Sequence, residues 1–383
     1  EFQINTLGSE QVDFPTVTAL SNGGYFVVWS EAASLEPADL YGRFFDASGN
    51  EVGSRITLDI GDPTTGNAQF IHGSSLADVA ELSDGNIAIT YRNGAGPTVA
   101  KVIDQSGNTV VSEFSIGLGS LSGHQEAKSH ESYANSEATS ANITALENGG
   151  FVIVGANNPD VQTRVFENDG TPRSAKLVVN TSPGFISDDA DVSALSGGGH
   201  VIVWRTIDFS NGPAEWNVHA KVYNDAGTPV SGDINVALDI DHSSLLNEGT
   251  TLTGSPDVAG LPNGGFVVVW TSGAIGTQIS GQQFDASGNP VGSEFAVNSE
   301  GDFAGVPSIA ATGDGGWVVS WTSFIPSDGG TFYNVFAQQF DPQGNKVGDE
   351  FLVNEYKGEF QGYQEVEVLQ NGQLVAVWQS DAP

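Results

Sequence analysis

The sequence contains no cysteine and no methionine. A chain without cysteine has no disulfides, no thiol nucleophile and no thiolate metal site, so sulfur chemistry is excluded. It also lacks an apolar run long enough to cross a bilayer as a helix, and residue 1 does not open a targeting leader. We therefore expect no membrane insertion, and any export signal must lie outside these residues.

Basic residues are scarce: 12 Lys and Arg stand against 47 Asp and Glu, which gives a net charge of −35. Such a charge repels nucleic acid and anionic membranes at long range, so we exclude nucleic acid as a partner. The acidity is compatible with solubility in a salty or extracellular medium and with Ca²⁺ binding through carboxylates. No nucleotide-binding fingerprint is present, so we expect no organic cofactor.

The chain is rich in one repeated pattern, shown best by residues 255–270 (SPDVAGLPNGGFVVVW). A short apolar run, a Pro/Asn/Gly turn and a run that is apolar at every position predict a hairpin whose second strand is covered on both faces. In this unit a third strand is expected at 279–285 and a fourth at 294–298. The first glycine of the same turn recurs seven times, as Gly23, Gly85, Gly149, Gly198, Gly264, Gly315 and Gly372.

Repeats of four short strands are typical of a β-propeller, whereas the rival, a β-solenoid, has a shorter period and no hairpin turns. Residues 1–5 (EFQIN) match the fourth strands at 294–298 (EFAVN) and 350–354 (EFLVN), which predicts that both termini build the last blade. Since only six third strands exist, that blade has three strands or the chain is a module of a longer one. We therefore predict an all-β fold, a seven-bladed β-propeller of four-stranded antiparallel blades.

The prediction treats residues 1–383 as a single domain. Its blades cover residues 14–59, 77–117, 140–180, 190–237, 256–298, 307–354, and 364–379 with 1–5. Connections from fourth to first strands and from second to third strands emerge on one face and vary most in length. Function on a rigid scaffold concentrates on variable loops, so this loop-rich face is expected to carry the function, unless its loops are neutral insertions.

Four turns have the pattern Asp-x-x-Gly-Asn and begin at Asp46, Asp104, Asp285 and Asp341. They could be mistaken for calcium loops. We interpret them as hairpin turns, because Asp caps its own turn and Gly supplies the positive φ that such turns need.

Four first strands place a carboxylate just before their central apolar residue, and the other three blades have Thr16, Asn142 and Ser308 there. First strands of a propeller line its central channel, so these oxygens could hold a cation. The alternative, which we favour, is hydrogen bonding to channel water and neighbouring backbone. The candidate metal ligands are Asp78, Asp191, Asp257 and Glu365.

Blades 2 to 4 are the candidate ligand site. The tryptophan of the repeat is replaced by Tyr91 in blade 2 and by Gly155 in blade 3, next to a long polar connection, and Arg92 and Arg205 follow the tryptophan position in blades 2 and 4. Arg suits planar recognition of carboxylate or sulfate. The predicted ligand-binding residues are Tyr91, Arg92, Glu126, Lys128 and Arg205, and the candidate catalytic residues are His124, His130 and Tyr133.

The alternative is that each arginine pairs with a local carboxylate such as Asp208 and that the loop only fills the gap. A similar alternative applies to basic residues at one equivalent place in four third strands. Their stems could cover the blade interface while their heads pair with carboxylates. These residues are Arg43, Lys101, Arg164 and Lys221.

Three segments carry a resemblance: 264–272 (GGFVVVWTS), 281–299 (GQQFDASGNPVGSEFAVNS) and 337–354 (AQQFDPQGNKVGDEFLVN). They resemble the propeller-type repeats of large secreted bacterial surface proteins and adhesins of the calcium-associated repeats-in-toxin type. The resemblance implies a secreted, extracellular protein and a multidomain parent. It leaves open what the loop-rich face binds.

We expect a non-enzymatic adhesion module that recognises a glycan or another cell-surface polymer, as a monomer or as part of a larger chain. One alternative is a polysaccharide lyase or glycoside hydrolase with its pocket at blades 2–4, since propellers host such chemistry. Another is a structural spacer without a ligand.

Overall fold

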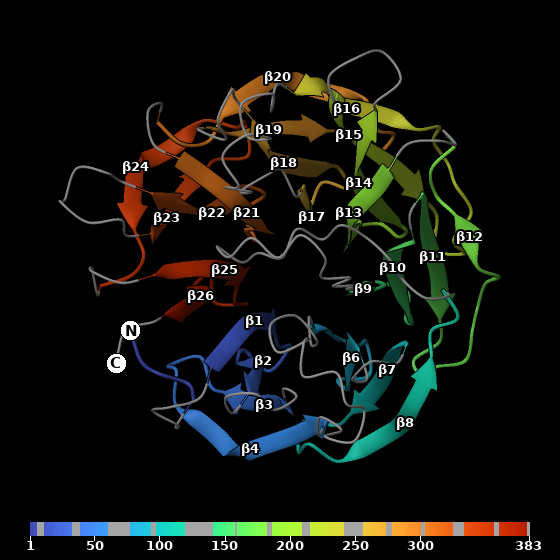
Figure 1. Cartoon of the computed structure of the whole chain (residues 1–383), viewed down its shortest axis with the longest axis vertical. Helices are drawn as coiled ribbons and strands as arrows, with labels where there is room; N and C mark the ends of the chain where they lie inside the picture. Colours follow the sequence, from blue (N-terminus) through green and yellow to red (C-terminus); the bar gives the residue numbers. More distant parts are fainter. Residues whose placement is uncertain are drawn as a thin grey trace.

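The computed structural model describes residues 1–5, 11–32, 39–59, 77–92, 97–118, 141–157, 159–181, 186–208, 215–240, 256–272, 278–299, 303–324, 333–355 and 360–380. These residues form antiparallel sheets arranged in a ring, so the fold is an all-β propeller (Figure 1). The described part of the chain contains no helix of the length and hydropathy that a membrane crossing requires.

Each blade runs outward in chain order from its first strand at the centre to its fourth strand at the rim (Figure 1). The first three blades consist of β1 (Gln11–Ala19), β2 (Tyr25–Ala32), β3 (Asp39–Phe45) and β4 (Glu51–Asp59); β5 (Asp78–Glu81), β6 (Ile87–Arg92), β7 (Thr98–Ile103) and β8 (Thr109–Ser115); and β9 (Ala141–Ala145), β10 (Phe151–Asn157), β11 (Asp160–Phe166) and β12 (Leu177–Val178). The next three consist of β13 (Ile186–Ala194), β14 (His200–Asp208), β15 (Glu215–Tyr223) and β16 (Ile234–Ile240); β17 (Asp257–Gly260), β18 (Phe266–Ser272), β19 (Gln278–Phe284) and β20 (Pro290–Ala296); and β21 (Phe303–Ala311), β22 (Trp317–Phe324), β23 (Tyr333–Phe340) and β24 (Lys346–Leu352).

The seventh repeat differs from the other six. It forms a two-stranded sheet of β25 (Gln361–Val368) and β26 (Leu374–Ser380), so the described chain has six four-stranded blades, not the seven that the repeat count predicted. The count was wrong because it took seven hairpins as seven blades, whereas among the described residues β26 pairs with β25 and with no third strand. We call β25 and β26 the seventh sheet.

The expected pairing of residues 1–5 with the last blade is not seen, because these residues form no strand. Ile4 instead packs between the two ends of the ring, against a cluster that includes Trp29 of blade 1 and Val377 of β26. β1 also contacts β25 and β26 directly. The first blade and the seventh sheet are therefore neighbours, and the termini lie close together (Figure 1).

The second strands form the centre of each blade. In blade 5, Phe266, Val267, Val268 and Val269 are 0% exposed. Phe266 and Val268 pack toward blade 4, while Val267 and Val269 pack toward blade 6. Both faces of the strand are thus buried, as the unbroken apolar run predicted, and each such side chain contributes about 1.5–3 kcal/mol to the hydrophobic stabilisation.

The Asp-x-x-Gly-Asn segments are hairpin turns, as predicted. The backbone amides of Ser48 and Asn50 donate to Asp46 Oδ1 at 2.8 and 2.9 Å, and Gly49 adopts a φ of 81°. The side-chain amide of Asn50 also donates to Asp46 Oδ2 at 2.9 Å, and this bond, together with the backbone ones, lowers the pKa of Asp46. Equivalent bonds form at Asp104, Asp285 and Asp341.

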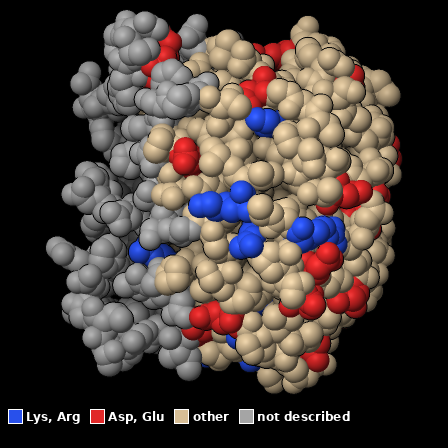
Figure 2. Space-filling view, turned by 90° about the vertical axis from the view of Figure 1, so that its right-hand side faces the viewer, with Lys and Arg blue, Asp and Glu red and all other residues tan. Residues whose placement is uncertain are grey.

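Two basic residues of the third strands reach back across the blade interface, and a third pairs within its own blade. Lys101 Nζ donates to the carbonyl of Leu58 in blade 1 at 2.9 Å, and Lys221 Nζ donates to that of Val179 in blade 3 at 2.8 Å. Arg43 pairs with Glu51. Figure 2 shows basic side chains gathered between acidic ones on one side of the ring. The alternative reading is therefore confirmed in part. The heads of Arg43 and Lys221 pair with the carboxylates of Glu51 and Asp233, and Lys101 and Lys221 extend across the blade interface.

Candidate functional site at the central channel

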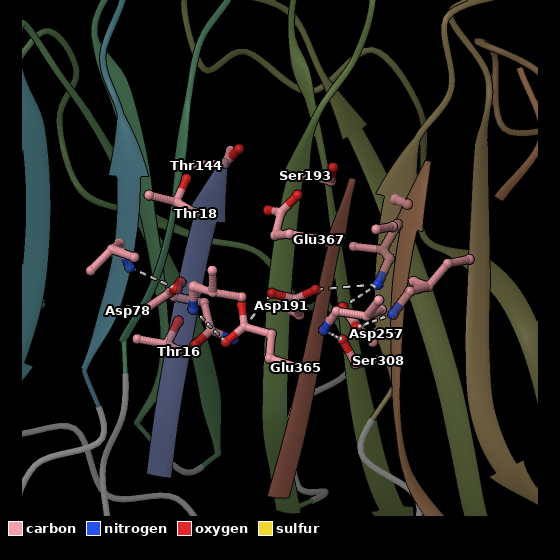
Figure 3. A pocket seen from close by; sticks show the side chains of 18 of the residues that line it. Thr16, Thr18, Asp78, Thr144, Asp191, Ser193, Asp257, Ser308, Glu365 and Glu367 are labelled. Atoms are coloured by element: carbon pink, nitrogen blue, oxygen red, sulfur yellow. Dashed lines mark hydrogen bonds between the residues drawn. The ribbon is translucent and has the colours of Figure 1, made fainter. Parts of the chain in front are cut away.

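The first strands bring the predicted ring residues together around a central channel of about 540 Å³. We call these seven residues the clasp ring: Thr16, Asp78, Asn142, Asp191, Asp257, Ser308 and Glu365. Figure 3 labels all of them except Asn142. They occupy one equivalent place in the six blades and in the seventh sheet. The sequence pattern therefore correctly identified seven residues that lie at the same depth in the channel.

Most of the clasp-ring side chains bond to the backbone of the next first strand. Asp78 Oδ2 accepts from the amide of Ile143 at 2.7 Å, and Asp257 Oδ2 accepts from the amide of Ile309 at 2.8 Å (Figure 3). A first strand that ends a sheet leaves amides unpaired, and a buried unpaired amide is costly. The side chains thus satisfy these amides and tie neighbouring blades together.

The same bond crosses the interface on both sides of the seventh sheet. The amide of Val366 donates to Ser308 Oγ at 3.2 Å, and the amide of Val17 donates to Glu365 Oε2 at 3.2 Å. Thr16 is the exception: its Oγ1 is buried and, in the described part of the chain, has no hydrogen-bond partner. The clasp ring consequently connects the last repeat to the first even though the seventh sheet has two strands.

The carboxylates of the channel perturb one another. Burial raises the pKa of Asp191 well above its usual range, and the charge of Asp257 and a hydrogen bond to it raise it further. Glu367 lies two residues after Glu365 on the same face of β25. Burial raises its pKa to about 7, and the charges of Asp78 and Asp257 make smaller contributions. Asp191 therefore keeps its proton to a higher pH than a free aspartate does, and Glu367 titrates near pH 7.

The clasp geometry fits the hydrogen-bonding interpretation of these residues. Among the described residues, no group of three or more histidine and carboxylate side chains has the spacing of a metal site. Cation binding by Asp78, Asp191, Asp257 and Glu365 stays a prediction.

The mouth of the channel on the loop-rich face contains residues in the left-handed backbone region. Phe14, Asp189, Val306 and Tyr363 have φ values of 52°, 46°, 53° and 55°, each two residues before a clasp-ring position. A register shift interrupts the strand pairing at each of these places. Side chains other than glycine rarely adopt this conformation, and such strain concentrates at ligand clamps and active sites.

Four aromatic side chains form a continuous series of ring contacts that begins at Phe14 in the channel mouth. The ring centroids of Phe14 and Tyr363 are 5.4 Å apart, those of Tyr363 and Phe360 are 5.1 Å apart, and those of Phe360 and Tyr333 are 5.5 Å apart. We call these four residues the aromatic row. It joins blade 1, the seventh sheet and blade 6. Phe14 and Phe360 are half-buried, whereas Tyr333 and Tyr363 are 8% exposed.

The aromatic row was not predicted from the sequence, because its members come from three repeats and are not at one equivalent place. The sequence did not indicate the strained backbone either. Phe14 and Val306 each precede a proline, which favours an extended conformation with negative φ in the residue before it. Their positive φ values instead occur at the register shifts within β1 and β21.

Arg205 does not emerge on a surface as predicted. Its side chain is 2% exposed, its Nη2 lies 2.8 Å from Asp189 Oδ2, and its guanidinium lies 4.5 Å from the centre of the Trp216 ring. A buried arginine needs a paired charge, so the bulge at Asp189 supplies the partner from the adjacent first strand. The carboxylate that pairs with Arg205 in this contact is thus Asp189 rather than Asp208.

Tyr91 is also buried, at 2% exposed, and its hydroxyl donates to Glu113 Oε2 at 3.0 Å. Burial and the charge of Glu113 raise its pKa. Arg92 ends β6 and is half-buried. The remaining predicted site residues, His124, Glu126, Lys128, His130 and Tyr133, lie outside the described residues.

No family model matches the sequence, and no curated protein matches it. Solved structures match it in fold. A protein of unknown function from Dyadobacter fermentans aligns with a TM-score of 0.52 at 12% identity, over 98% of this chain and 92% of that one. An α-L-arabinofuranosidase from Fusarium graminearum, bound to an iminosugar inhibitor, aligns with a TM-score of 0.50 at 14% identity, over 86% and 93%. An α-L-arabinanase from Penicillium chrysogenum, complexed with arabinobiose, aligns with a TM-score of 0.49 at 14% identity, over 82% and 88%.

Proposed function

We propose that this propeller is a carbohydrate-binding module that holds a glycan at the mouth of its channel on the loop-rich face. The aromatic row carries the proposal. Aromatic rings provide large, rigid contact surfaces, and ligand sites combine such rings with a few placed polar groups. Here Phe14 and Phe360 offer partly exposed rings beside a channel whose polar groups come from the clasp ring.

The backbone supports the same location. Three of the strained residues, Phe14, Val306 and Tyr363, belong to the two blades and the sheet that supply the aromatic row. Strain persists only where the surrounding structure fixes it, and it holds side chains in orientations that a regular strand does not allow. The site is thus rigid before a ligand arrives, which lowers the entropy cost of binding.

Binding is favoured over catalysis because the described carboxylates near the mouth have structural partners. Most glycosidases use two carboxyl groups, one on either side of the scissile bond. In the channel, Asp78, Asp257 and Glu365 accept backbone amides of the neighbouring first strands, and Asp189 is paired with Arg205. These roles stabilise the ring.

The alternative is a polysaccharide lyase or glycoside hydrolase. It is supported by the likeness of fold to the arabinofuranosidase, a glycan-active propeller. The candidate catalytic residues would then be His124, His130 and Tyr133 in the connection before blade 3. A fold hosts many functions, so this support is by analogy.

A glycan array followed by titration calorimetry tests the proposal. We expect Phe14→Ala and Phe360→Ala to weaken binding of the selected glycan about tenfold each, and Phe351→Ala, an exposed aromatic on β24, to leave it unchanged. Equal binding by all variants would remove the aromatic row as the site. Release of new reducing ends or unsaturated uronates by the unmodified ring would favour the enzyme, and the absence of any glycan ligand would favour the spacer.

We also propose that the ring works outside the cell as an adhesin-like module that uses Ca²⁺, as its repeat resemblance and its charge of −35 indicate. An antibody against the ring is then expected to label intact producing cells. Labelling that requires cell lysis would contradict this setting.

A further inference from the structure

One pair of positions on the outer strands carries opposite charges in blade 4 and like charges in blade 3. In blade 4, Lys221 of β15 faces Asp233, which directly precedes β16, and Lys221 Nζ lies 2.8 Å from Asp233 Oδ1. The same two positions of blade 3 hold Arg164 of β11 and Lys176, which directly precedes β12. Blade 3 thus has two cations where its neighbour has an ion pair.

The strand register places these two cations opposite one another. Thr163 of β11 pairs with Leu177 of β12, so the next residues in this register are Arg164 and Lys176. Arg164 Nε also donates to the carbonyl of Ser174, two residues before Lys176, at 3.2 Å. Directly opposite side chains share one face of a sheet and lie close together. Arg164 and Lys176 therefore present two positive charges side by side at the rim of blade 3.

The surroundings supply no described carboxylate to neutralise this pair. Among the residues that the structure describes, neither Arg164 nor Lys176 lies within salt-bridge distance of an Asp or Glu. At the end of the fourth strand of the preceding blade, blade 1 has Asp59, whereas blade 2 has Gly117 at the equivalent place. A Cβ on Gly117 would lie 2.6 Å from Arg164 Nη1, so the guanidinium packs against this backbone.

Both side chains are accessible to a ligand. Lys176 is exposed and Arg164 is half-buried. The Nη groups of Arg164, which carry most of its N–H donors, have no hydrogen-bond partner in the described part of the chain. Partly buried donors without a partner cost free energy that a bound acceptor recovers. Figure 2 views the side of the ring on which β11 and β12 lie and shows basic side chains grouped near its middle.

The chemistry of the pair selects an oxyanion. The planar guanidinium of Arg164 matches a carboxylate or sulfate group, and Lys176 adds a point charge. The net charge of −35 repels polyanions, and this repulsion grows with the charge density of the ligand. Duplex DNA carries one charge per about 1.7 Å, whereas an acidic polysaccharide spaces its charges by whole sugar units. The second polymer is therefore the better match.

We propose that Arg164 and Lys176 bind a carboxylate or sulfate group of an acidic polysaccharide at the rim of blade 3. This rim site lies outside the aromatic row and the channel mouth, so it adds a second contact for glycans and does not depend on the first. The guanidinium accepts the oxyanion through its Nη groups, and the ammonium of Lys176 approaches the same group from the opposite strand.

Lys176→Asp tests the pair, because it copies Asp233 of blade 4. The variant is expected to keep the fold, since Lys176 is exposed and the new carboxylate can pair with Arg164 as Asp233 pairs with Lys221. The probes are hexagalacturonate and a chondroitin sulfate hexasaccharide, titrated calorimetrically at low salt, where screening is weakest. We expect the unmodified chain to bind at least one probe and Lys176→Asp to weaken that binding about tenfold or more. The probe that binds more tightly distinguishes carboxylate from sulfate.

The matched control is Lys346→Asp, which makes the same change of charge at an exposed lysine of β24 and is expected to bind the probe normally. Equal weakening by both variants would show that binding follows the net charge alone, and the proposal would be wrong. Binding of neither probe would overturn it as well. A DNA oligonucleotide that binds more tightly than both probes and is lost in Lys176→Asp would identify a phosphate ligand instead.

Phe14→Ala separates the rim site from the channel mouth. The acidic hexasaccharide is expected to bind this variant as it binds the unmodified chain. If Phe14→Ala removes the binding and Lys176→Asp does not, the acidic glycan occupies the mouth. The rim proposal would then fail while the proposed function stands.

Discussion

Blade 5 and the seventh sheet begin from nearly the same sequence and end in different environments. Trp270 of β18 is 1% exposed between blades 4 and 5, whereas the equivalent Trp378 of β26 is half-buried and donates its indole N–H to Gln361 at 2.9 Å. Burial in a propeller is therefore set by the neighbouring strand as much as by the residue itself. The seventh sheet thus shows how the first two strands of the repeat are packed without a paired third strand.

The largest effect is expected from replacing each of the two tryptophans by alanine, which tests the difference in burial between β18 and β26. Trp270→Ala is expected to lower the free energy of unfolding by about 3–5 kcal/mol, because it leaves a cavity in a packed interface. Trp378→Ala is expected to cost about 1–2 kcal/mol, since water already reaches its site. Urea denaturation followed by circular dichroism measures both, and equal losses would mean that β26 is as well packed as β18.

Deleting residues 1–5 tests how far the N-terminus substitutes for the strands that the seventh sheet lacks. Ile4 packs in the cluster shared by blade 1 and β26, and the ring of Phe2 lies 5.7 Å from that of Phe45. We expect a loss of about 1–2 kcal/mol from this apolar contact. An unchanged melting temperature would show that the ring closes through β1 and β25 alone.

The seventh sheet and blade 5 also differ inside the channel. The seventh sheet has Glu367 at the place where blade 5 has Ala259. The folded chain raises the pKa of Glu367 from 4.5 to about 7, so the folded state binds a proton that the unfolded state releases. This contribution is present in full below pH 4.5 and is lost as the pH rises toward 7.

Glu367→Gln is accordingly expected to stabilise the chain at pH 8, by on the order of 1 kcal/mol, and to have little effect at pH 4. Melting curves across this range check it, with Glu294→Gln on blade 5 as an exposed control. A gain that is equal at both pH values would point to relief of general repulsion instead.

The smallest expected effect concerns calcium. If the clasp-ring carboxylates bind Ca²⁺, a ligand held only by the folded state stabilises it by mass action. Ca²⁺ should then raise the melting temperature more than Mg²⁺ at equal concentration, and Asp257→Asn should remove the difference. Equal shifts by both ions would mean screening of the net charge.

The repeat by itself determined the architecture of this protein. Seven hairpin turns, an apolar run between them and a polar residue before each central first-strand position predicted antiparallel blades, the capped turns and the level of the clasp ring. These features depend on residues close in sequence, where glycine, proline and alternation of side chains act directly on the backbone.

Only the tertiary structure decided what lies between repeats. Lys221 reaches the carbonyl of Val179 in blade 3, Phe14 meets Tyr363 from the other end of the chain, and Leu374 stays exposed because no described third strand covers it. None of these partners has a fixed spacing in the sequence. Contacts between blades arise when the ring brings its ends together, so the pattern of one repeat cannot specify them.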